Sequence, residues 1–211
     1  MRSYPIFWRF ITPAAVLAVG LFWSLSSQPA TAYPPAVGVT GKATNCLACH
    51  ANDGPWKDDA NLVLDLLDKE TGASTRQDDG SFVLAVKRGQ KRTFLAVIGR
   101  AKADTAPPPN RNGWTFVDPT QVGEDYLGAK FALGWNADLT ISCRLIGDKH
   151  AAYEGANTTV LPITVQPTES AKDVELSWQV LMTAGLSTKG SAKGDLVQNY
   201  FERRVLLKVE E

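Results

Sequence analysis

Apolar and polar residues alternate over much of the chain after residue 60, which is the period of a β-strand with one buried face. Around Trp178, for example, the apolar Leu176 and Val180 alternate with polar neighbours. The segment 61–67 fits helical spacing as well, and a strand is favoured there. Strands are predicted at 61–67, 81–87, 92–98, 114–118, 128–134, 137–146, 158–166, 172–182 and 199–209.

Glycine, proline and polar clusters separate these segments and indicate how they connect. The short polar stretch 88–91 joins 81–87 to 92–98, so these two strands are expected to pair with each other. Consecutive prolines in 106–110 cannot donate main-chain hydrogen bonds, so that segment is expected to be an extended connection. The predicted fold class is mainly β: an antiparallel β-sandwich with immunoglobulin-like layers.

The beginning of the chain has the pattern of a secretory signal. Arg2 and Arg9 form a basic start, the apolar run 10–25 contains no acidic residue, and Ala30-Thr31-Ala32 supplies a small-x-small cleavage site. An uncleaved membrane anchor is the alternative, but the run is short for the roughly 20 residues that a span requires. A signal peptide over 1–32 is therefore predicted to be removed, which leaves Tyr33 as the N-terminus of an exported, periplasmic protein without a membrane span.

Composition excludes some functions. Of the 211 residues, 44% are hydrophobic, and 22 Lys and Arg balance 22 Asp and Glu. These proportions are typical of a globular domain rather than of a disordered chain. No large field of one sign is present to attract nucleic acid, so no nucleic-acid partner is expected.

The motif Cys46-Leu47-Ala48-Cys49-His50 carries the strongest chemical signal. Cys-x-x-Cys-His is the attachment signature of a c-type haem, in which both thiols form thioethers to the porphyrin and the histidine binds the iron. A redox dithiol would need a βαβ context, and a zinc site would need a second ligand pair. We therefore predict one covalent haem c on Cys46 and Cys49, with His50 as the proximal ligand, within an attachment segment 33–60. Residues 61–211 are predicted to form the β-sandwich body, in one domain with that segment.

Four groups are candidates for the second axial position of the iron: Cys143, His150, Met182 and the amino group of Tyr33. Cys143 is an odd thiol in an exported protein, and the alternation in 137–146 turns it towards a buried face. It is the preferred candidate, although a small core residue or an intermolecular disulfide would also explain it.

The three other candidates have competing explanations. His150 follows a polar stretch and is expected at the surface. Met182 falls on the same strand face as Trp178, where filling the core is the usual role, yet His/Met ligation is familiar in electron carriers. The N-terminal amine of Tyr33 stands close to the haem motif in the sequence, and the connecting segment looks short for that role.

With its single motif, β-rich body and later Ser142-Cys143-Arg144, the chain resembles the small subunits of the heterodimeric c-type cytochromes of anaerobic ammonium oxidisers. The resemblance implies His/Cys ligation, with His50 proximal and Cys143 distal. It also implies a second, related haem c subunit as partner, the alternative being a homodimer.

The predicted function is redox chemistry, or the binding or sensing of nitric oxide or carbon monoxide, at a low-potential His/Cys-ligated haem. Reduction is expected to weaken the thiolate bond and to open a position for either gas. The alternative is a simple periplasmic electron carrier with His/Met or His/His ligation, working with a redox partner protein. No catalytic constellation accompanies the haem motif, so enzymatic turnover is not expected.

Overall fold

The computed structural model describes residues 44–48, 50–122, 131–139, 143–185 and 196–211. By its contacts the chain divides after Tyr33, and every described residue belongs to the unit Pro34–Glu211. Within the described residues the strands are β1 (Leu62–Asp68), β2 (Phe82–Lys87), β3 (Arg92–Arg100), β4 (Arg111–Val117), β5 (Trp135–Leu139), β6 (Cys143–Leu145), β7 (Asn157–Pro167), β8 (Val174–Ala184) and β9 (Val197–Glu210). Short 3₁₀ turns occur at η2 (Cys46–Ala48), η3 (Pro119–Gln121) and η4 (Ala151–Tyr153).

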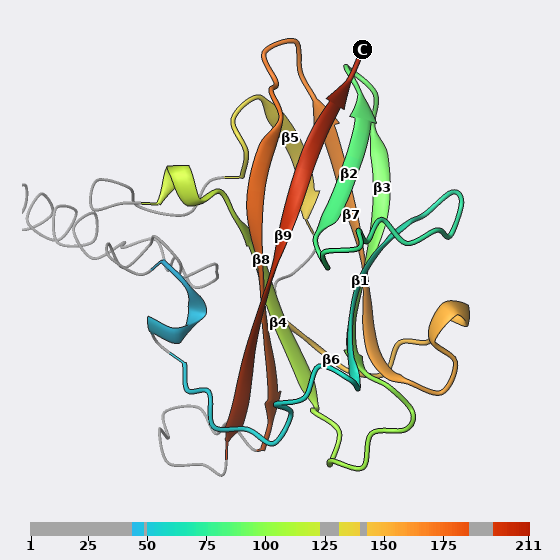
Figure 1. Cartoon of the computed structure of the whole chain (residues 1–211), viewed down its shortest axis with the longest axis vertical. Helices are drawn as coiled ribbons and strands as arrows, with labels where there is room; N and C mark the ends of the chain where they lie inside the picture. Colours follow the sequence, from blue (N-terminus) through green and yellow to red (C-terminus); the bar gives the residue numbers. More distant parts are fainter. Residues whose placement is uncertain (1–43, 49, 123–130, 140–142, 186–195) are drawn as a thin grey trace, which may run out of the picture. The chain divides into compact units, whose positions relative to one another are not determined.

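The strands form two sheets (Figure 1). One has four strands in the order β1-β3-β7-β5, and the other has five in the order β2-β9-β8-β4-β6. The mainly β prediction is therefore confirmed. The prediction of purely antiparallel pairing is wrong at one place, because β2 runs parallel to β9, with Phe82 opposite Val205.

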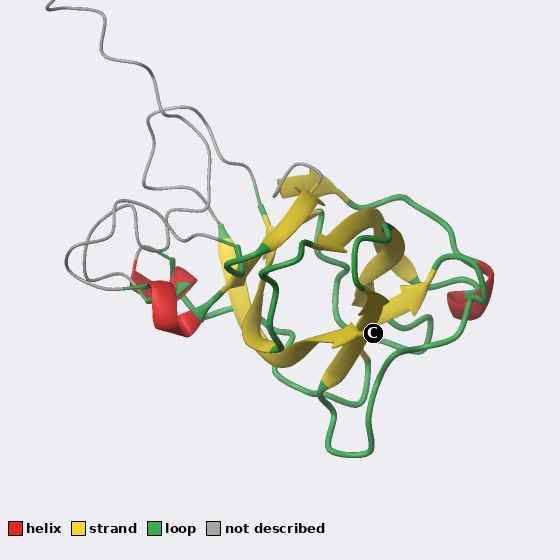
Figure 2. Cartoon of the chain, turned by 90° about the horizontal axis from the view of Figure 1, so that it is seen from above, coloured by secondary structure: helices red, strands yellow, loops and turns green. Residues whose placement is uncertain are grey.

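Both sheets contribute to one hydrophobic core. Phe94, Ile98 and Ile163 come from the four-stranded sheet, and Trp178 and Val205 come from the five-stranded sheet. Seen from above, the strands lie around the interior that these side chains fill (Figure 2). Four tryptophans belong to this core: Trp56, Trp114, Trp135 and Trp178.

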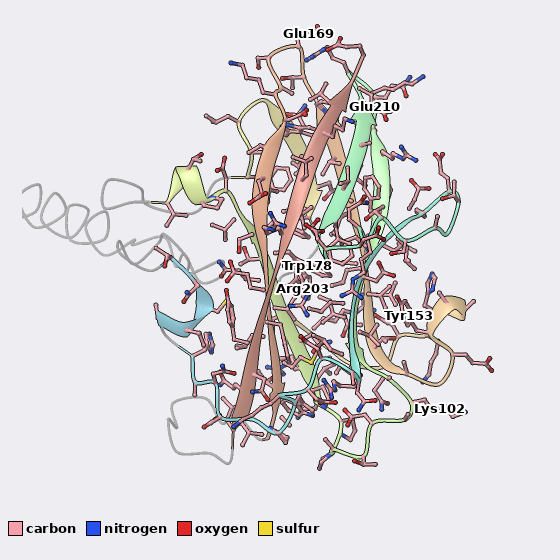
Figure 3. All side chains as sticks on the ribbon, in the orientation of Figure 1. Lys102, Tyr153, Glu169, Trp178, Arg203 and Glu210 are labelled. Atoms are coloured by element: carbon pink, nitrogen blue, oxygen red, sulfur yellow. The ribbon has the colours of Figure 1, made fainter. Side chains whose placement is uncertain are left out.

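Trp178, which is labelled in Figure 3, makes aromatic contacts in the core. Its indole stacks on Phe116 at 5.7 Å between ring centroids and meets Phe82 edge-on at 5.6 Å. Trp178 has no exposed surface, and its indole N–H has no hydrogen-bond partner among the described residues. Edge-on and offset contacts of this kind add to the stabilisation from burial.

Several strand predictions need correction. β2 and β3 do not pair with each other, because they belong to different sheets. The predicted strand 137–146 is two strands, since β5 ends at Leu139 in one sheet and β6 begins at Cys143 in the other. Of the predicted strand 128–134, residues 128–130 lie outside the described part and 131–134 form a turn before β5. The segment 106–110, predicted to be an extended connection, contains neither helix nor strand and has bends at 106 and 110.

One side of the two sheets is closed by the segment that follows β1. The N–H of Thr75 donates to the carbonyl of Leu66 in β1 at 2.9 Å, and its own carbonyl accepts from the N–H of Val83 in β2 at 3.1 Å. Isolated bridges from Ser74 to β1 and from Arg76 to β2 continue this connection. The edge strands of the two sheets are thus joined through main-chain hydrogen bonds.

Candidate haem-binding site

The predicted attachment motif forms a tight turn on η2. The N–H of Ala48 donates to the carbonyl of Asn45 at 3.3 Å, and the N–H of His50 donates to the carbonyl of Cys46 at 3.0 Å. The second bond closes a turn of helical type, which brings His50 back towards Cys46. Cys49 lies outside the described residues, so its predicted role stays a prediction.

The motif lies against the outer face of the five-stranded sheet, which we define as the face turned away from the shared core. Along β8 the alternation is direct: Trp178 and Val180 belong to the core, and Gln179 between them projects to the other face. Figure 1 shows η2 beside β8, on the side away from β1 and β3. The motif is therefore outside the core rather than within it.

Gln179 anchors the beginning of the motif. Its Oε1 accepts from the main-chain N–H of Cys46 at 3.2 Å, and the Sγ of Cys46 lies 3.5 Å from the same oxygen. Its Nε2 donates to the carbonyl of Thr44 at 3.1 Å. Gln179 itself is buried, with 2% of its surface exposed, so the oxygen and the nitrogen of its side-chain amide are held in place. Cys46 is thus positioned by a fixed side chain of the sheet.

Gln198 of β9 contacts the predicted iron ligand. Its Oε1 lies 3.0 Å from Nδ1 of His50. An amide oxygen can only accept, so this pairing fits the ring form that carries its proton on Nδ1 and its lone pair on Nε2. His50 is exposed, and Nε2 has no hydrogen-bond partner among the described residues. This is the ring form that iron coordination through Nε2 requires.

The segment after His50 is fastened to the start of β9 by polar contacts. The N–H of Gly54 donates to the carbonyl of Gln198 at 2.7 Å, and Asp53 accepts from the N–H of Gln198 at 3.2 Å. Asn199 donates to Asn52 at 2.9 Å and accepts from the N–H of Trp56 at 2.8 Å.

These contacts pair the part of β9 that extends beyond β2. Residues 51–60, which follow His50, contain no helix.

Cys143 lies on the same outer face as the motif. It is opposite Gly113 of β4, Gly113 is opposite Leu181 of β8, and Leu181 is opposite Tyr200 of β9. Directly opposed residues of antiparallel strands project to the same side. Gln179 and Gln198 are each two residues from this row, so they share its face.

The prediction that Cys143 points inward is wrong. Leu139 and Leu145, which share its predicted buried face, are 38% and 61% exposed, and Cys143 is half-buried. The alternation in 137–146 belongs to two strands in different sheets, so it does not report a single buried face. An intermolecular disulfide, named above as another explanation of Cys143, is compatible with this outward orientation.

The other candidate ligands lie elsewhere or outside the described part. Met182 has no exposed surface and belongs to the shared core, as expected from its phase with Trp178. The sheet separates it from the motif. His150 is half-buried and caps η4, where its Nδ1 accepts from the N–H of Ala152 at 3.2 Å. Tyr33 lies outside the described residues.

The position of η4 separates His150 from the motif as well. Tyr153 of η4 packs against Val63, Leu67 and Val97, which form a second small cluster on β1 and β3 of the four-stranded sheet. Val97 alternates with the core residues Ala96 and Ile98, so this cluster is on the outer side of that sheet. His150 therefore lies next to the sheet opposite the one that holds the motif.

Tyr200 is a further oxygen donor on the motif face, and its electrostatics exclude a phenolate. Burial of the ring raises the pKa of Tyr200 well above its ordinary value, and the carboxylate of Glu202 adds to the rise. The hydroxyl donates to Glu202 at 2.8 Å, which stabilises the protonated form. Tyr200 therefore remains a neutral phenol engaged with Glu202.

The residues of this face fit a covalently attached haem. A haem iron needs only one or two side chains, so a large ligand cluster is not required. Among the described residues there is no group of three or more His, Cys, Asp or Glu arranged to hold a metal ion. Leu47 beside the motif is 39% exposed and Leu145, two residues from Cys143, is 61% exposed, so apolar side chains flank both proposed ligands.

Comparison with protein-family models gave no match for this chain, and comparison with curated proteins gave none either. Within the described ranges, no helix is both long and apolar enough to cross a membrane.

Sequence reasoning did not find the two glutamines that hold the motif. Gln179 and Gln198 are polar residues in alternating strands, a pattern that usually indicates contact with solvent. Both are nevertheless buried, at 2% and 6% exposure, because the motif segment covers them. The signal that marks them is their contact with Cys46 and His50, which depends on pairing residues more than 130 positions apart.

Proposed function

We propose that this chain is an exported c-type cytochrome with one haem attached through Cys46 and Cys49. His50 binds the iron on one side and Cys143 on the other, in a low-potential centre that serves electron transfer or the binding of nitric oxide or carbon monoxide. In this proposal the two sheets form a β-sandwich with immunoglobulin-like layers, and the segment 33–60 carries the haem on its outer face.

The observation that carries the proposal is the shared face of the motif and Cys143. Gln179 and Gln198 hold Cys46 and His50 on the outer face of the five-stranded sheet, and the strand register places Cys143 on that face. Gly113, which has no side chain, stands beside Cys143 in the row. Met182 projects to the opposite side of this sheet, so His/Met ligation receives no support.

The chain's own residues would have distinct roles around this centre. When bound there, the haem supplies a one-electron couple and, with one axial side open, a position for a small gas. Cys143 as a thiolate stabilises the ferric charge and favours a low potential. It stands on β6, which has three residues and pairs only with β4 among the described strands, so few hydrogen bonds restrain its withdrawal.

The direct test is the ferric absorption and electron paramagnetic resonance spectrum of the exported, haem-matured protein beside Cys143→Ala. We expect a low-spin thiolate signature that is lost in the variant. Met182→Leu is the matched control, because it conserves volume at a core position and should leave the spectrum unchanged. Identical spectra of the wild type and Cys143→Ala would refute His/Cys ligation.

Gas binding is tested separately on the reduced protein. Titration with carbon monoxide or nitric oxide should change the Soret band, because the weakened thiolate leaves room for the gas. A reduced protein whose spectrum does not respond to either gas would restrict the function to electron transfer. The spectrum of Cys143→Ala serves as a reference for a centre without the thiolate.

The resemblance adds a partner to the proposal, namely a second, related haem c subunit, with a homodimer as the alternative. Co-expression of the chain with a candidate subunit, followed by determination of the mass of the purified assembly, tests this part. A chain that remains monomeric at all concentrations, alone and with the candidate subunit, would contradict it.

A further inference from the structure

The ring of His50 has one described polar partner, the side-chain amide of Gln198. The two atoms are 3.0 Å apart, and the two residues are 148 positions apart in the chain. Coordination of iron through Nε2 requires the proton on Nδ1, and a proton on Nδ1 is stabilised by an acceptor. The Oε1 of Gln198 is such an acceptor.

Gln198 is itself held firmly, and by the segment that carries His50. Its N–H donates to Asp53, its carbonyl accepts from Gly54, and only 6% of its surface is exposed. Its Cα is also opposite Thr183 of β8. The acceptor therefore has little freedom to turn away from the imidazole.

We infer that Gln198 is a positioning residue for His50. Gln198 selects the ring form of His50 that is protonated on Nδ1 and fixes the direction in which Nε2 points. This inference rests on the proposed function, because it assigns a purpose to the ring that His50 would need as an iron ligand. An acceptor on Nδ1–H also makes Nε2 a stronger electron donor, and stronger donation favours ferric over ferrous iron.

The functional consequence is a potential set partly by Gln198. Removing the acceptor in Gln198→Leu should favour reduction, and replacing it with a carboxylate in Gln198→Glu should oppose reduction. At a fixed applied potential, we expect Gln198→Leu to raise the ratio of reduced to oxidised protein about tenfold, which corresponds to about 59 mV for one electron. The expected order of potentials is Leu highest, Gln intermediate and Glu lowest.

The matched control is Gln166→Leu. Gln166 of β7 likewise uses its side-chain amide in a hydrogen bond, donating to the main-chain carbonyl of Gly89 at 2.7 Å, but it belongs to the other sheet. Its loss should change neither the potential nor the electron paramagnetic resonance of the iron. Thermal unfolding of all four proteins shows whether a shift in potential follows from general destabilisation.

A second measurement does not depend on haem. The core contains no residue of the motif, so the full chain produced without haem is expected to fold. The ¹⁵N shifts of its two ring nitrogens report the ring form of His50. We expect the Nδ1–H form in the wild type and Gln198→Glu, and a mixture in Gln198→Leu.

Two results decide the inference. If Gln198→Leu leaves the ring form, the potential and the resonance spectrum unchanged, the inference is overturned. If the ring form depends on Gln198 but the protein carries no haem ligated by His50, the hold on the ring is supported and the proposed function is refuted.

Discussion

Substitution of Gly54 with alanine tests whether the segment after the haem motif is docked as closely as the structure shows. A Cβ at this position would lie 2.6 Å from Oδ1 of Asn199 and 2.9 Å from the main-chain carbon and oxygen of Gln198. The strand pairing of β8 and β9 holds this main chain, so it cannot retreat cheaply. Overpacking of this kind costs about 1–3 kcal/mol, which is about 5- to 150-fold in the docking equilibrium.

The assay is hydrogen exchange of the Trp56 amide, which donates to Asn199 at 2.8 Å when the segment is docked. We expect faster exchange in Gly54→Ala by the factor given above, with core amides of β8 changed less. Gly72→Ala is the control: its φ of +70° makes it strained, but its Cβ meets nothing within 4 Å and it is not part of the motif face. Unchanged exchange at Trp56 in Gly54→Ala would refute the close docking.

Three other substitutions probe the polar interior by their effect on stability. The side chain of Arg100 is 1% exposed and binds Asp104 at 2.5 Å. Because Arg100→Met leaves the carboxylate of Asp104 buried without this partner, it should lower the free energy of unfolding, measured by urea titration, by about 3–5 kcal/mol. Adding Asp104→Leu should recover part of this loss. Equal losses in the single and double variants would contradict this. Burial tends to raise the pKa of Asp68, but hydrogen bonds from Thr71 and its other partners outweigh it and lower the pKa from 3.8. The contribution of Asp68 to stability is therefore present above about pH 4 and is lost as the pH falls through the lowered pKa. Asp68→Asn should lower the free energy of unfolding by about 1–3 kcal/mol at neutral pH and by progressively less in acid. A difference in stability that does not depend on pH would contradict this prediction. Tyr153→Phe removes the hydrogen bond to the buried carboxylate of Asp65 and should lower the midpoint of thermal unfolding through a loss of about 1–3 kcal/mol, whereas an unchanged midpoint would show that Asp65 finds another donor.

Local patterning was enough to predict most of the strands. The alternation around Trp178 and the apolar stretch that becomes β3 correspond to strands because each buries one face in the core. Pairing was not predictable in the same way. The short connection 88–91 suggested that the flanking strands pair, but β2 pairs with β9 and β3 pairs with β1 and β7. Such partners depend on contacts between distant segments, which a local pattern does not report.

The candidate site shows the same division. The spacing of Cys46, Cys49 and His50 is a local signal, so the motif was visible in the sequence. The face of Cys143 was predicted wrongly because Leu139 and Cys143 belong to strands of different sheets. Alternation that runs across two sheets does not indicate which residues share one buried face. The contact between Gln198 and His50 depends on the position of β9 next to the motif, and the residue types alone do not predict it.

The connection made by Thr75 between β1 and β2 has a consequence for self-association. Open strand edges are the places where β-proteins add further chains, and on this side the chain's own segment engages main-chain groups of Leu66 in β1 and of Val83 in β2. Among the described strands, the outer edges of β5 and β6 remain as the positions where a strand could be added. A strand added to the five-stranded sheet beyond β6 would lie directly beside the strand that carries Cys143.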